Sequence, residues 1–345
     1  MAELRETLER LLNREDLTEP EAAALLAALT DPSTAPAMAG ALLAALRSKG
    51  LTADEVRGFA SAMRRLARRP TLPPGPPAID IVGTGGDASG SFNISTGAAL
   101  LTAAMGVRVV KHGNRSISSR SGSADLLECL GLPQPLDEKR SGECLAATGF
   151  TFLFAPHYHP AMKEIAPVRR ALGVRTVFNL LGPLTNPAEP SFGLIGAYSR
   201  DAARLMAETL AGMPIQRVFV VHGEPGWDEP TPCGPFELYD VTPGHVVRTQ
   251  RDPLDCGLAR CTPQSLAGGD AARNATGMRA VFTGQDRGSH RDALVLNAAL
   301  ALEVTGTVAD PHEAIRAASD ALDRGDGARP LEKLATFGRS IGGAP

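Results

Sequence analysis

Hydrophobic positions in the first seventy residues repeat with the period of an α-helix. The first stretch places four leucines on one expected helical face, at Leu4, Leu8, Leu11 and Leu12. A later stretch repeats this pattern with Val56, Phe59, Met63 and Leu66. The spacing predicts amphipathic helices whose apolar faces either form a core or are buried against a partner subunit.

Signals at the expected helix ends agree with this pattern. Thr18 with Glu21, and Thr52 with Glu55, have the spacing of a capping box, in which each side chain bonds the other residue's backbone N–H. Gly50 suits the end of the helix before the second box. We therefore expect a helical domain over residues 1–70.

A cluster of prolines follows this helical region. Five prolines and one glycine fall between residues 70 and 77. Proline lacks a backbone N–H and cannot continue a helix, so residues 71–77 are interpreted as a stiff linker.

The rest of the chain alternates short apolar runs with helical patterns. A strand at 78–82, a helix of small residues at 93–105 and a strand at 107–110 make a βαβ unit with a parallel sheet. Further strands are expected at 218–221 and 279–282, and further helices at 160–172, 292–303 and 311–323. Pro167 would break or restart the first of these helices.

The predicted fold class is α/β. It combines a small N-terminal α-helical domain with a large α/β domain over residues 78–345, which has a mainly parallel central sheet. A helical segment near residues 160–190 is expected to rejoin the helical domain.

Composition and charge narrow the possible partners. The chain has 345 residues, of which 43% are hydrophobic, and 35 Lys+Arg against 38 Asp+Glu give a net charge of −3. This balance argues against a dedicated nucleic-acid or membrane-surface binder. No apolar run approaches the about 20 residues of a membrane span. The five cysteines include no Cys-x-x-Cys pair, so we expect a reducing cytoplasm and no zinc site.

The glycine loop after the first predicted strand is the first candidate site. Residues 83–91 read Gly-Thr-Gly-Gly-Asp-Ala-Ser-Gly-Ser. Glycines let backbone N–H groups approach an anion, and the next helix N-terminus adds about half a positive charge. Asn93, Ser95 and Thr96 add side-chain donors there. The pattern predicts a phosphate or pyrophosphate site, and Asp87 indicates a bridging cation.

Three other interpretations of the glycine loop are weaker. No Gly-Lys-Ser/Thr follows, so it is not the loop of a P-loop NTPase. A dinucleotide fingerprint fits loosely, but Asp87 would face the pyrophosphate, and Lys111 stands where the ribose-binding acid is expected. A plain tight turn does not need four glycines and an acid.

The basic loop, residues 111–123, follows the second strand and reads Lys-His-Gly-Asn-Arg-Ser-Ile-Ser-Ser-Arg-Ser-Gly-Ser. Loops at the carboxyl ends of neighbouring parallel strands line one crevice, so this loop should help to bind a ligand with several phosphates. A solvated surface loop and a single-stranded nucleic-acid groove are the alternatives. Against the second, no Phe, Tyr or Trp between Phe92 and Phe150 could stack on bases.

At these loops the sequence resembles the anthranilate phosphoribosyltransferases, a tryptophan-biosynthesis family with the nucleoside phosphorylase-like fold. The likeness begins with Asp-Ile-Val-Gly-Thr-Gly-Gly-Asp at 80–87 and extends over residues 4–337, with further matches at 93–96, 111–125, 159–163, 168–169, 175–187, 226–229 and 296–299. It implies magnesium-dependent transfer of 5-phosphoribose from phosphoribosyl pyrophosphate (PRPP) to the amine of anthranilate, with release of pyrophosphate. It also implies a homodimer joined through the helical domain.

The resemblance also assigns site residues. PRPP would be bound by Gly83, Gly86, Asp87, Ser91, Asn93, Ile94, Ser95, Thr96, Lys111, His112, Gly113, Asn114, Arg115, Ser116, Ile117, Ser118, Ser119 and Ser123. Mg²⁺, as two ions of which one arrives with PRPP, would be held by Ser95, Asp228 and Glu229. Anthranilate would be contacted by Gly83, Asn114, His159, Arg169 and Pro183.

The implied chemistry needs no dedicated general base, because the amine of anthranilate is neutral at pH 7 and already nucleophilic. Breaking the anomeric C–O bond leaves an oxocarbenium-like sugar, so Lys111 and the metal would stabilise the leaving pyrophosphate. Arg169 matches the family position that binds the acceptor carboxylate, and a guanidinium does so in a bidentate pair. Its neighbour Arg170 would point about 100° away on a helix.

Two departures from the family pattern leave acceptor choice open. Trp227 stands where a smaller aliphatic residue is usual, and Pro230 follows the acidic pair. A paralogue with another aminobenzoate acceptor is therefore an alternative. So is a nucleoside phosphorylase, which would have no use for two metal acids, or a nucleic-acid-binding relative, which should have a basic surface and eroded acids.

Overall fold

The computed structural model describes residues 2–87, 89–116 and 120–342, and the expected PRPP-binding residues Ile117, Ser118 and Ser119 lie outside these ranges. The strands are β1 (Ile79–Gly83), β2 (Val109–Gly113), β3 (Phe150–Phe154), β4 (Phe192–Gly196), β5 (Arg217–Gly223), β6 (Phe236–Thr242) and β7 (His245–Arg251). The N-terminal helices are α1 (Ala2–Leu12), α2 (Glu19–Leu29), α3 (Pro36–Lys49) and α4 (Ala53–Leu66).

The later helices follow or separate the strands. They are α5 (Ile94–Ala104), α6 (Ser123–Cys129), α7 (Glu138–Thr148), α8 (Ala155–Tyr158), α9 (Met162–Leu172), α10 (Phe178–Leu184), α11 (Arg200–Ala211), α12 (Ala271–Phe282), α13 (Ser289–Val304), α14 (Pro311–Asp323) and α15 (Ala328–Ile341). Two 3₁₀ turns, η1 (Pro253–Cys256) and η2 (Pro263–Leu266), lie between β7 and α12. The expected α/β fold with a helical N-terminal part is confirmed.

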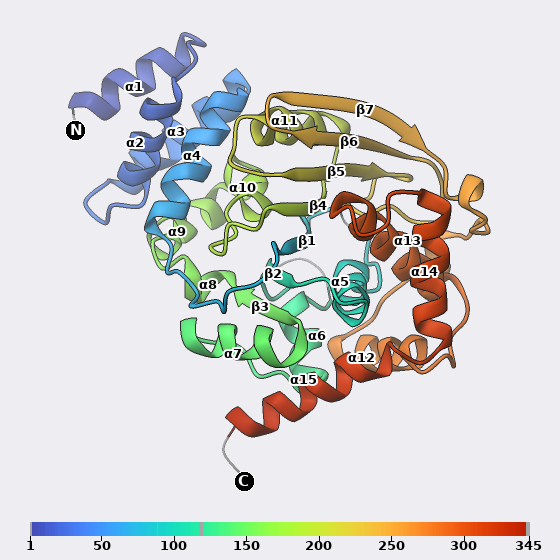
Figure 1. The fold of residues 1–345 in the computed structure, drawn as a ribbon. Coiled ribbons are helices and arrows are strands. Elements are labelled where there is room, and N and C mark those ends of the chain that lie inside the picture. The colour runs from blue at the N-terminus through green and yellow to red at the C-terminus, as the bar shows by residue number, and fades with distance from the viewer. Residues whose placement is uncertain (1, 88, 117–119, 343–345) are drawn as a thin grey trace.

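The N-terminal helices pack together at one end of the molecule, beside α9 and α10 (Figure 1). Both expected capping boxes form, Thr18 with Glu21 at α2 and Thr52 with Glu55 at α4. Gly50 ends α3 with a φ of 94°, a left-handed conformation that glycine adopts without steric cost.

The two apolar stripes are buried only in part. Leu11, Val56 and Phe59 lie in the core, whereas Leu12 is 61% exposed and Leu66 is 43% exposed. Placing Leu12 on the buried face was wrong, because it lies about 100° around the helix from Leu11.

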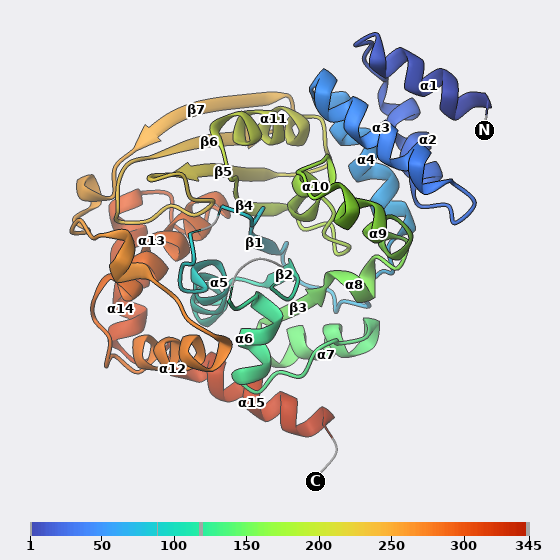
Figure 2. The same ribbon diagram turned by 180° about the vertical axis from the view of Figure 1, so that it is seen from behind.

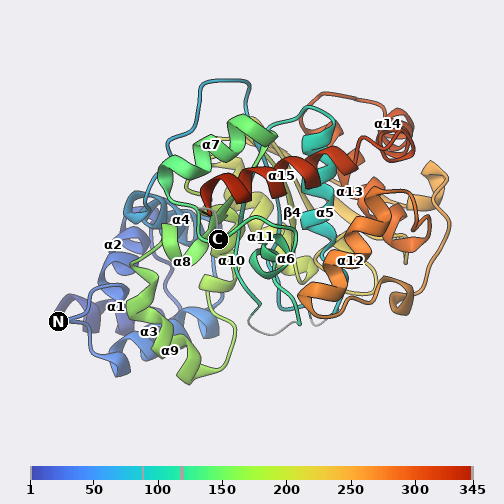
Figure 3. The same ribbon diagram turned by 90° about the horizontal axis from the view of Figure 1, so that it is seen from below.

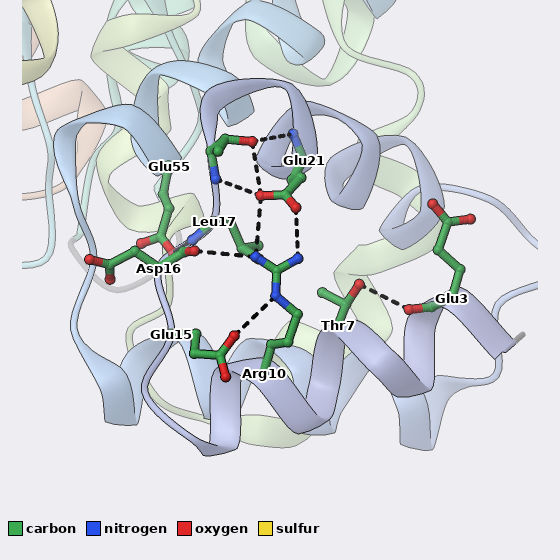
Figure 4. Close-up of polar contacts among 9 residues, drawn as sticks. Glu3, Thr7, Arg10, Glu15, Asp16, Leu17, Glu21 and Glu55 are labelled. Carbon is green, nitrogen blue, oxygen red and sulfur yellow. Dashed lines mark hydrogen bonds and ion pairs between the residues drawn. The ribbon is translucent and has the colours of Figure 1, made fainter.

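Charged side chains join the helices of the bundle, and Figure 4 shows the contacts around Arg10. The Arg10 guanidinium on α1 bonds the Glu21 carboxylate of the α2 capping box at 2.6 Å. Deeper in the bundle, Glu55 is fully buried and accepts from the Leu17 backbone N–H at 3.0 Å. The Lys49 ammonium bonds the same Glu55 carboxylate at 3.0 Å, so the buried charge is paired.

Removing the Glu55 carboxylate should destabilise the bundle, because Lys49 would lose its buried partner and the Leu17 N–H would stay unbonded. We expect Glu55→Ala to lower the free energy of unfolding in urea by about 3 kcal/mol. Glu15→Ala is the matched control, since Glu15 is exposed and pairs with Arg10 at the surface, where the loss should stay within about 1 kcal/mol. Equal losses in the two variants would contradict this account.

The sheet has the order β3-β2-β1-β4-β5-β6-β7. Strands β1 to β5 run parallel, and β6 and β7 are added as an antiparallel edge. The chain moves from β1 outward to β2 and β3, then returns to place β4 on the other side of β1. Ligands bind in such sheets beyond the carboxyl ends of the strands at this reversal, so the topology points to the end of β1.

Alternating residues of the parallel strands are buried on opposite faces of the sheet. In β5, Phe219 and Val221 pack with α5, α13 and α14, whereas Val218 and Val220 pack with α10, α11 and the N-terminal helices. Parallel strands that are covered on both faces read as continuous apolar runs, which is why 218–221 could be predicted as a buried strand. The second apolar cluster runs without interruption from α2–α4 to the sheet.

The view from behind shows α12, α13 and α14 on the side of the sheet away from the N-terminal helices (Figure 2). Seen from below, α15 lies across α7 and α5 (Figure 3), and it packs against both. No helix in the described part of the chain is long and apolar enough to cross a membrane.

Two local predictions were wrong. Residues 279–282 form the end of α12 rather than a strand, since Val281 and Phe282 lie on the buried face of a helix that Asp270 caps. A four-residue apolar run does not distinguish the two structures. Pro167 does not break α9, which continues from Met162 to Leu172. Pro167 and Lys163 are both exposed, so water can bond the Lys163 carbonyl that the proline leaves free.

Candidate active site

Three loops meet at the carboxyl edge of the sheet. The glycine loop (residues 83–91) follows β1, the basic loop follows β2, and the acid loop (residues 224–235) follows β5. Strands β1 and β2 are neighbours, as expected, and β4 separates β1 from β5. The acid loop crosses the end of β4 to reach the glycine loop, as its hydrogen bonds show.

Asp228 lies against the paired ends of β1 and β4. Gly83 and Gly196 are paired across these strands, and a Cβ on either would overlap Asp228 atoms. The Asp228 carboxylate accepts from the Gly85 N–H at 2.5 Å, and the Asp228 N–H donates to the Asp87 carboxylate at 3.2 Å. The close approach therefore explains the need for glycine at 83 and 196, and sequence reasoning missed the second of these.

Glu229 contacts the glycine loop and the start of α5. One carboxylate oxygen accepts from the Ser95 N–H at 3.0 Å, and the other from the Ser91 hydroxyl at 3.2 Å. A carboxylate is stabilised at a helix N-terminus, where the backbone N–H groups lack partners within the helix. The three residues expected to hold metal, Ser95, Asp228 and Glu229, are thus brought together.

The electrostatics of this cluster favour a cation. Burial, with the nearby charges of Asp87 and Glu229, raises the pKa of Asp228 well above its usual range. Burial and Asp87 also raise the pKa of Glu229 to about 7, against the opposing effect of the Ser95 and Ser91 hydrogen bonds and of Lys111. A positive ion would relieve this crowding of acids.

The carboxylates nevertheless form no closed metal cage. Among the described residues, no group of three or more His, Cys, Asp or Glu side chains is arranged to hold an ion. The oxygens of Asp228 and Glu229 face backbone N–H groups instead. Mg²⁺ commonly takes one or two carboxylates and completes its shell with water and phosphate oxygens, so the residues fit it as part of a shared site with a phosphorylated ligand.

Lys111 is 1% exposed and lies behind Asp228 and Glu229. Its ammonium donates to the Ile81 carbonyl and to the Ser95 hydroxyl, the latter at 3.2 Å. Burial lowers the pKa of Lys111, while Asp80, Glu229 and Asp228 oppose that shift. The lysine is therefore directed to the same point as the metal candidates.

Asp80 and Asn186 form a support that sequence reasoning missed. The buried Asp80 carboxylate accepts from the His112 N–H at 3.2 Å and from the Asn186 side chain at 2.8 Å. Burial raises the pKa of Asp80 to about 6. Both residues stood within the stretches that carry the family resemblance, and that was the signal that could have found them.

The basic loop is joined to α5 at two points. The Asn93 side chain donates to the Ser121 carbonyl at 3.2 Å, and the Thr96 hydroxyl donates to Ser123 at 3.0 Å. Ile94 lies between them in sequence, but its side chain is in the core, so only its backbone is available to a ligand.

The other side of the basic loop is closed by acids of α6. The Asp125 carboxylate accepts from the backbone N–H groups of Ser116 and Gly122 at 3.1 and 3.0 Å. The Arg115 guanidinium bonds Asp125 at 2.9 Å and Glu128 at 2.5 Å. Arg115 thus faces α6, while the exposed Asn114 follows directly from β2.

Apart from Gly83 at the end of β1, the residues expected to contact an aromatic acceptor lie just after β2, in α9 and α10, and after α8. The His112 and His159 rings meet edge to face at 5.1 Å, and His112 Nδ1 lies 3.0 Å from the Gly182 carbonyl, next to the buried Pro183. The Arg169 guanidinium lies 5.0 Å from the Phe178 ring centre at the start of α10.

Arg169 pairs with no carboxylate among the residues that the structure describes. Burial lowers its pKa, whereas its neighbour Arg170 is exposed. A half-buried guanidinium beside an aromatic ring is suited to bind an acceptor carboxylate.

Two further residues connect the glycine loop and the acid loop to the rest of the fold. The Arg175 guanidinium donates to the Gly86 carbonyl and lies 3.9 Å from the Tyr198 ring centre, while Arg47 of α3 donates to the Arg175 carbonyl at 2.7 Å. Trp227 is buried in the apolar cluster under the acid loop. The tryptophan is therefore an anchor for the loop within the core.

The paired histidines make stability depend on pH. Burial lowers the pKa of His112 to about 3 and that of His159 to about 4. In the unfolded chain both would take up protons below about pH 6.5. The unfolded state then binds more protons than the native state, so this contribution to stability is complete above pH 6.5 and is lost as the pH falls.

We expect the difference in unfolding free energy between the parent and a His112→Gln/His159→Gln variant to shrink or reverse between pH 6.5 and 4.5. The change should reach up to about 1.4 kcal/mol per pH unit for each histidine. The comparison with the variant removes the opposite slope that the raised pKa of Asp80 and of Glu229 produces. Parallel pH profiles of the two proteins would show that the histidines are not held neutral.

Comparison with known proteins places these features in a family. A family model described as "Glycosyl transferase family, a/b domain" matches residues 75–328, and one described as "Glycosyl transferase family, helical bundle domain" matches residues 5–67. The chain is 44% identical to the anthranilate phosphoribosyltransferase of Rubrobacter xylanophilus over 340 residues, 99% of each chain. It is 46% identical to that of Methylobacterium nodulans over 92% of this chain and 94% of the relative.

Solved structures of anthranilate phosphoribosyltransferases have the same fold as this chain. The crystal structure of anthranilate phosphoribosyltransferase from Thermus thermophilus matches with a TM-score of 0.89 and 41% identity over 96% of this chain and 99% of that one. The Saccharomyces cerevisiae enzyme in complex with PRPP and Mg matches with a TM-score of 0.88 and 27% identity over 99% of each chain. The same yeast enzyme in complex with 4-fluoroanthranilate has a TM-score of 0.87, with 27% identity over 99% of each chain.

Proposed function

The chain belongs to the anthranilate phosphoribosyltransferase family, and we propose on that premise that it transfers 5-phosphoribose from PRPP to the amine of anthranilate in tryptophan biosynthesis. The products are N-(5-phosphoribosyl)anthranilate and pyrophosphate. The observation that carries the proposal is the meeting of the glycine, basic and acid loops around Lys111, Ser95, Asp228 and Glu229. The structure of the yeast relative in complex with PRPP and Mg supports the same assignment of substrate and metal.

PRPP is a polyanion, so its binding depends on charge and on backbone donors. We propose that the PRPP site consists of the glycine-loop residues Gly83, Gly86, Asp87 and Ser91, the residues Asn93–Thr96 at the start of α5, and the basic-loop residues Lys111–Ser119 and Ser123. Gly85 and Gly86 have φ values of 70° and 73°, which turn the glycine loop sharply beneath α5. The loop leads into the N-terminus of α5, where backbone N–H groups without partners within the helix and the helix dipole favour an anion.

Mg²⁺ would be held by Ser95, Asp228 and Glu229, and we propose two ions of which one arrives with PRPP. When bound, the metal supplies positive charge to the leaving pyrophosphate. Lys111 adds a second charge, because its ammonium is fixed against Ser95. The Asp80 carboxylate holds the β2 backbone beside that lysine.

The acceptor needs orientation more than activation, since its aryl amine is neutral at pH 7. Arg169 would bind the carboxylate, and His159, Pro183, Asn114 and Gly83 would border the ring and its amine. The buried His112 and His159 are uncharged at neutral pH, so they offer a neutral wall to a flat aromatic acid. Positioning the amine against the anomeric carbon would then add to the rate gain from stabilising the leaving pyrophosphate.

The direct test is loss of anthranilate fluorescence when purified protein is mixed with PRPP and Mg²⁺. The proposal predicts stoichiometric consumption that stops when PRPP is omitted, and slower or no consumption of other aminobenzoates. Phosphorolysis of common nucleosides by inorganic phosphate would support the phosphorylase alternative instead. The buried acid pair does not favour that alternative, because a phosphorylase has no use for it.

Arg169→Ala should raise the KM for anthranilate by roughly 100-fold and leave the KM for PRPP within about twofold, since a charge-assisted bidentate contact contributes about 3 kcal/mol. Arg170→Ala is the matched control, because the neighbouring guanidinium is exposed. Steady-state kinetics with each substrate varied in turn gives both constants. An equal rise in the two KM values would remove Arg169 from the acceptor site.

Asp228→Asn together with Glu229→Gln should reduce kcat/KM for PRPP by at least about 100-fold and abolish its dependence on Mg²⁺, because the metal loses its carboxylates. The substitutions keep the size of both side chains, so thermal stability should change little. Titration of the rate with Mg²⁺ checks this. A variant with the parent's Mg²⁺ dependence would place the metal elsewhere.

We further propose a homodimer joined through the helical domain of residues 1–70, which the Pro-rich residues 71–77 link to the α/β domain of residues 78–345. Leu12 and Leu66 are large apolar side chains exposed on this domain, and a depression of about 650 Å³ between α2 and α4 is lined by Ala23, Ala24 and Ala27. Helix α9 packs against α3 of the bundle, which supports assigning α9 to that domain.

Five free thiols fit a cytoplasmic location.

A further inference from the structure

Asn93 stands at the cap position of α5 but does not cap it. An asparagine there ordinarily accepts from a backbone N–H of the first turn, yet Asn93 makes no such bond. Its amide is used instead across the site. It donates to the Ser121 carbonyl at 3.2 Å, and its oxygen accepts from the Ser121 hydroxyl at 3.1 Å. Asn93 therefore fixes the end of the basic loop to the start of α5.

The same Asn93 oxygen accepts a second hydrogen bond from Asn274 of α12, at 2.8 Å. Asn274 is 2% exposed and lies 181 residues further along the chain. Its own oxygen accepts from the Gly269 N–H at 2.7 Å, so both ends of the Asn274 amide are bonded. A buried amide is costly unless it is bonded in this way, and an apolar residue would pack on this face of α12 at no such cost.

The segment that contains Asn274 also contacts the glycine loop. We call residues 266–274 the strap. The Phe92 N–H donates to the Leu266 carbonyl at 2.9 Å, and the Gly268 N–H donates to the Gly90 carbonyl at 2.9 Å. A Cβ on Gly268 would overlap the Ser91 backbone, so the strap lies directly against this loop. The strap thus touches the glycine loop directly, and Asn274 is joined to the basic loop through Asn93.

We propose that Asn274 is a positioning residue for PRPP: through Asn93 it sets the basic loop against the N-terminus of α5 before substrate arrives. The role rests on the proposed function. Asn274 itself does not reach the substrate, because it acts from behind Asn93. The consequence is that the strap, which no phosphate-binding motif includes, controls the geometry of the phosphate site.

Asn274→Ala should raise the KM for PRPP by about 5- to 10-fold, the effect of losing one hydrogen bond that prepares the site. At saturating PRPP, kcat and the KM for anthranilate should stay within about twofold. Thr276→Ala is the matched control on the same helix, because its side chain is exposed and bonds only the Ala272 carbonyl of α12. Its kinetic constants should equal those of the parent.

A double-mutant cycle with Asn93→Ala separates positioning from general stability. If Asn274 acts through Asn93, the substitution at 274 should have no further effect on the PRPP KM once Asn93 is alanine. A purely structural role would lower the melting temperature in both backgrounds and leave the KM of a folded Asn274→Ala protein within twofold of the parent. That result, or a rise in KM that persists in the Asn93→Ala background, would overturn the proposal.

Asn274→Asp provides the same test if the alanine variant does not fold. The aspartate keeps an oxygen that can accept from the Gly269 N–H and replaces the donor to Asn93 by a second carboxylate oxygen, which repels the Asn93 oxygen and adds a negative charge. Its PRPP KM should rise more in the parent background than in the Asn93→Ala background, because only the added charge acts once the Asn93 side chain is absent, and an equal rise in the two backgrounds contradicts the proposal. A parent protein without turnover would instead refute the proposed function, and this role would fall with it.

Discussion

The structure depends on two adjacent carboxylates that are buried where their charge is least tolerated without a partner. Asp228 and Glu229 lie at the end of a parallel sheet, against backbone N–H groups of the glycine loop and of α5. The glycines at 83 and 196 leave the space that Asp228 occupies. Burial and repulsion from Asp87 raise the pKa of both acids, and the charge of Glu229 adds to the shift of Asp228; a divalent ion would reverse these shifts.

The remaining architecture holds the three loops around that pair. The reversal of strand order beside β1 brings loops from β1, β2 and β5 to one edge. Lys111 approaches from within the sheet, and Trp227 anchors the acid loop in the core. On the outer side, Arg47 and Arg175 connect the helical bundle to Gly86 of the glycine loop. A movement of the bundle relative to the sheet would therefore shift Gly86 in the proposed phosphate site.

Much of this arrangement could be predicted from local sequence patterns. The two capping boxes, the buried strand at 218–221 and the strand–glycine loop–helix unit follow from spacing and residue type, because each signal lies within a few residues. Family motifs then predicted which loops would bind phosphate and which acids would bind metal, and these site assignments stay predictions.

What escaped prediction depends on distant contacts. Asn186 supports Asp80 across 106 residues, and Asn274 supports Asn93 across 181. Asn274 does not differ in sequence from an ordinary polar residue of a helix, and only the family motif at 175–187 marks Asn186. The run at 279–282 was assigned to a strand because its length fits either structure, and only packing of α12 decides it. The Arg115 side chain likewise faces α6, since acids ten and thirteen residues ahead capture it.

The central claim is that the buried acid pair and a divalent ion together bind PRPP. Calorimetric titration of the protein with PRPP, in Mg²⁺ and then in excess chelator, tests it most directly. The account predicts saturable heat in Mg²⁺ and a loss of affinity of at least about 100-fold without it. Equal affinity in both conditions, or no heat of binding in Mg²⁺, would contradict it.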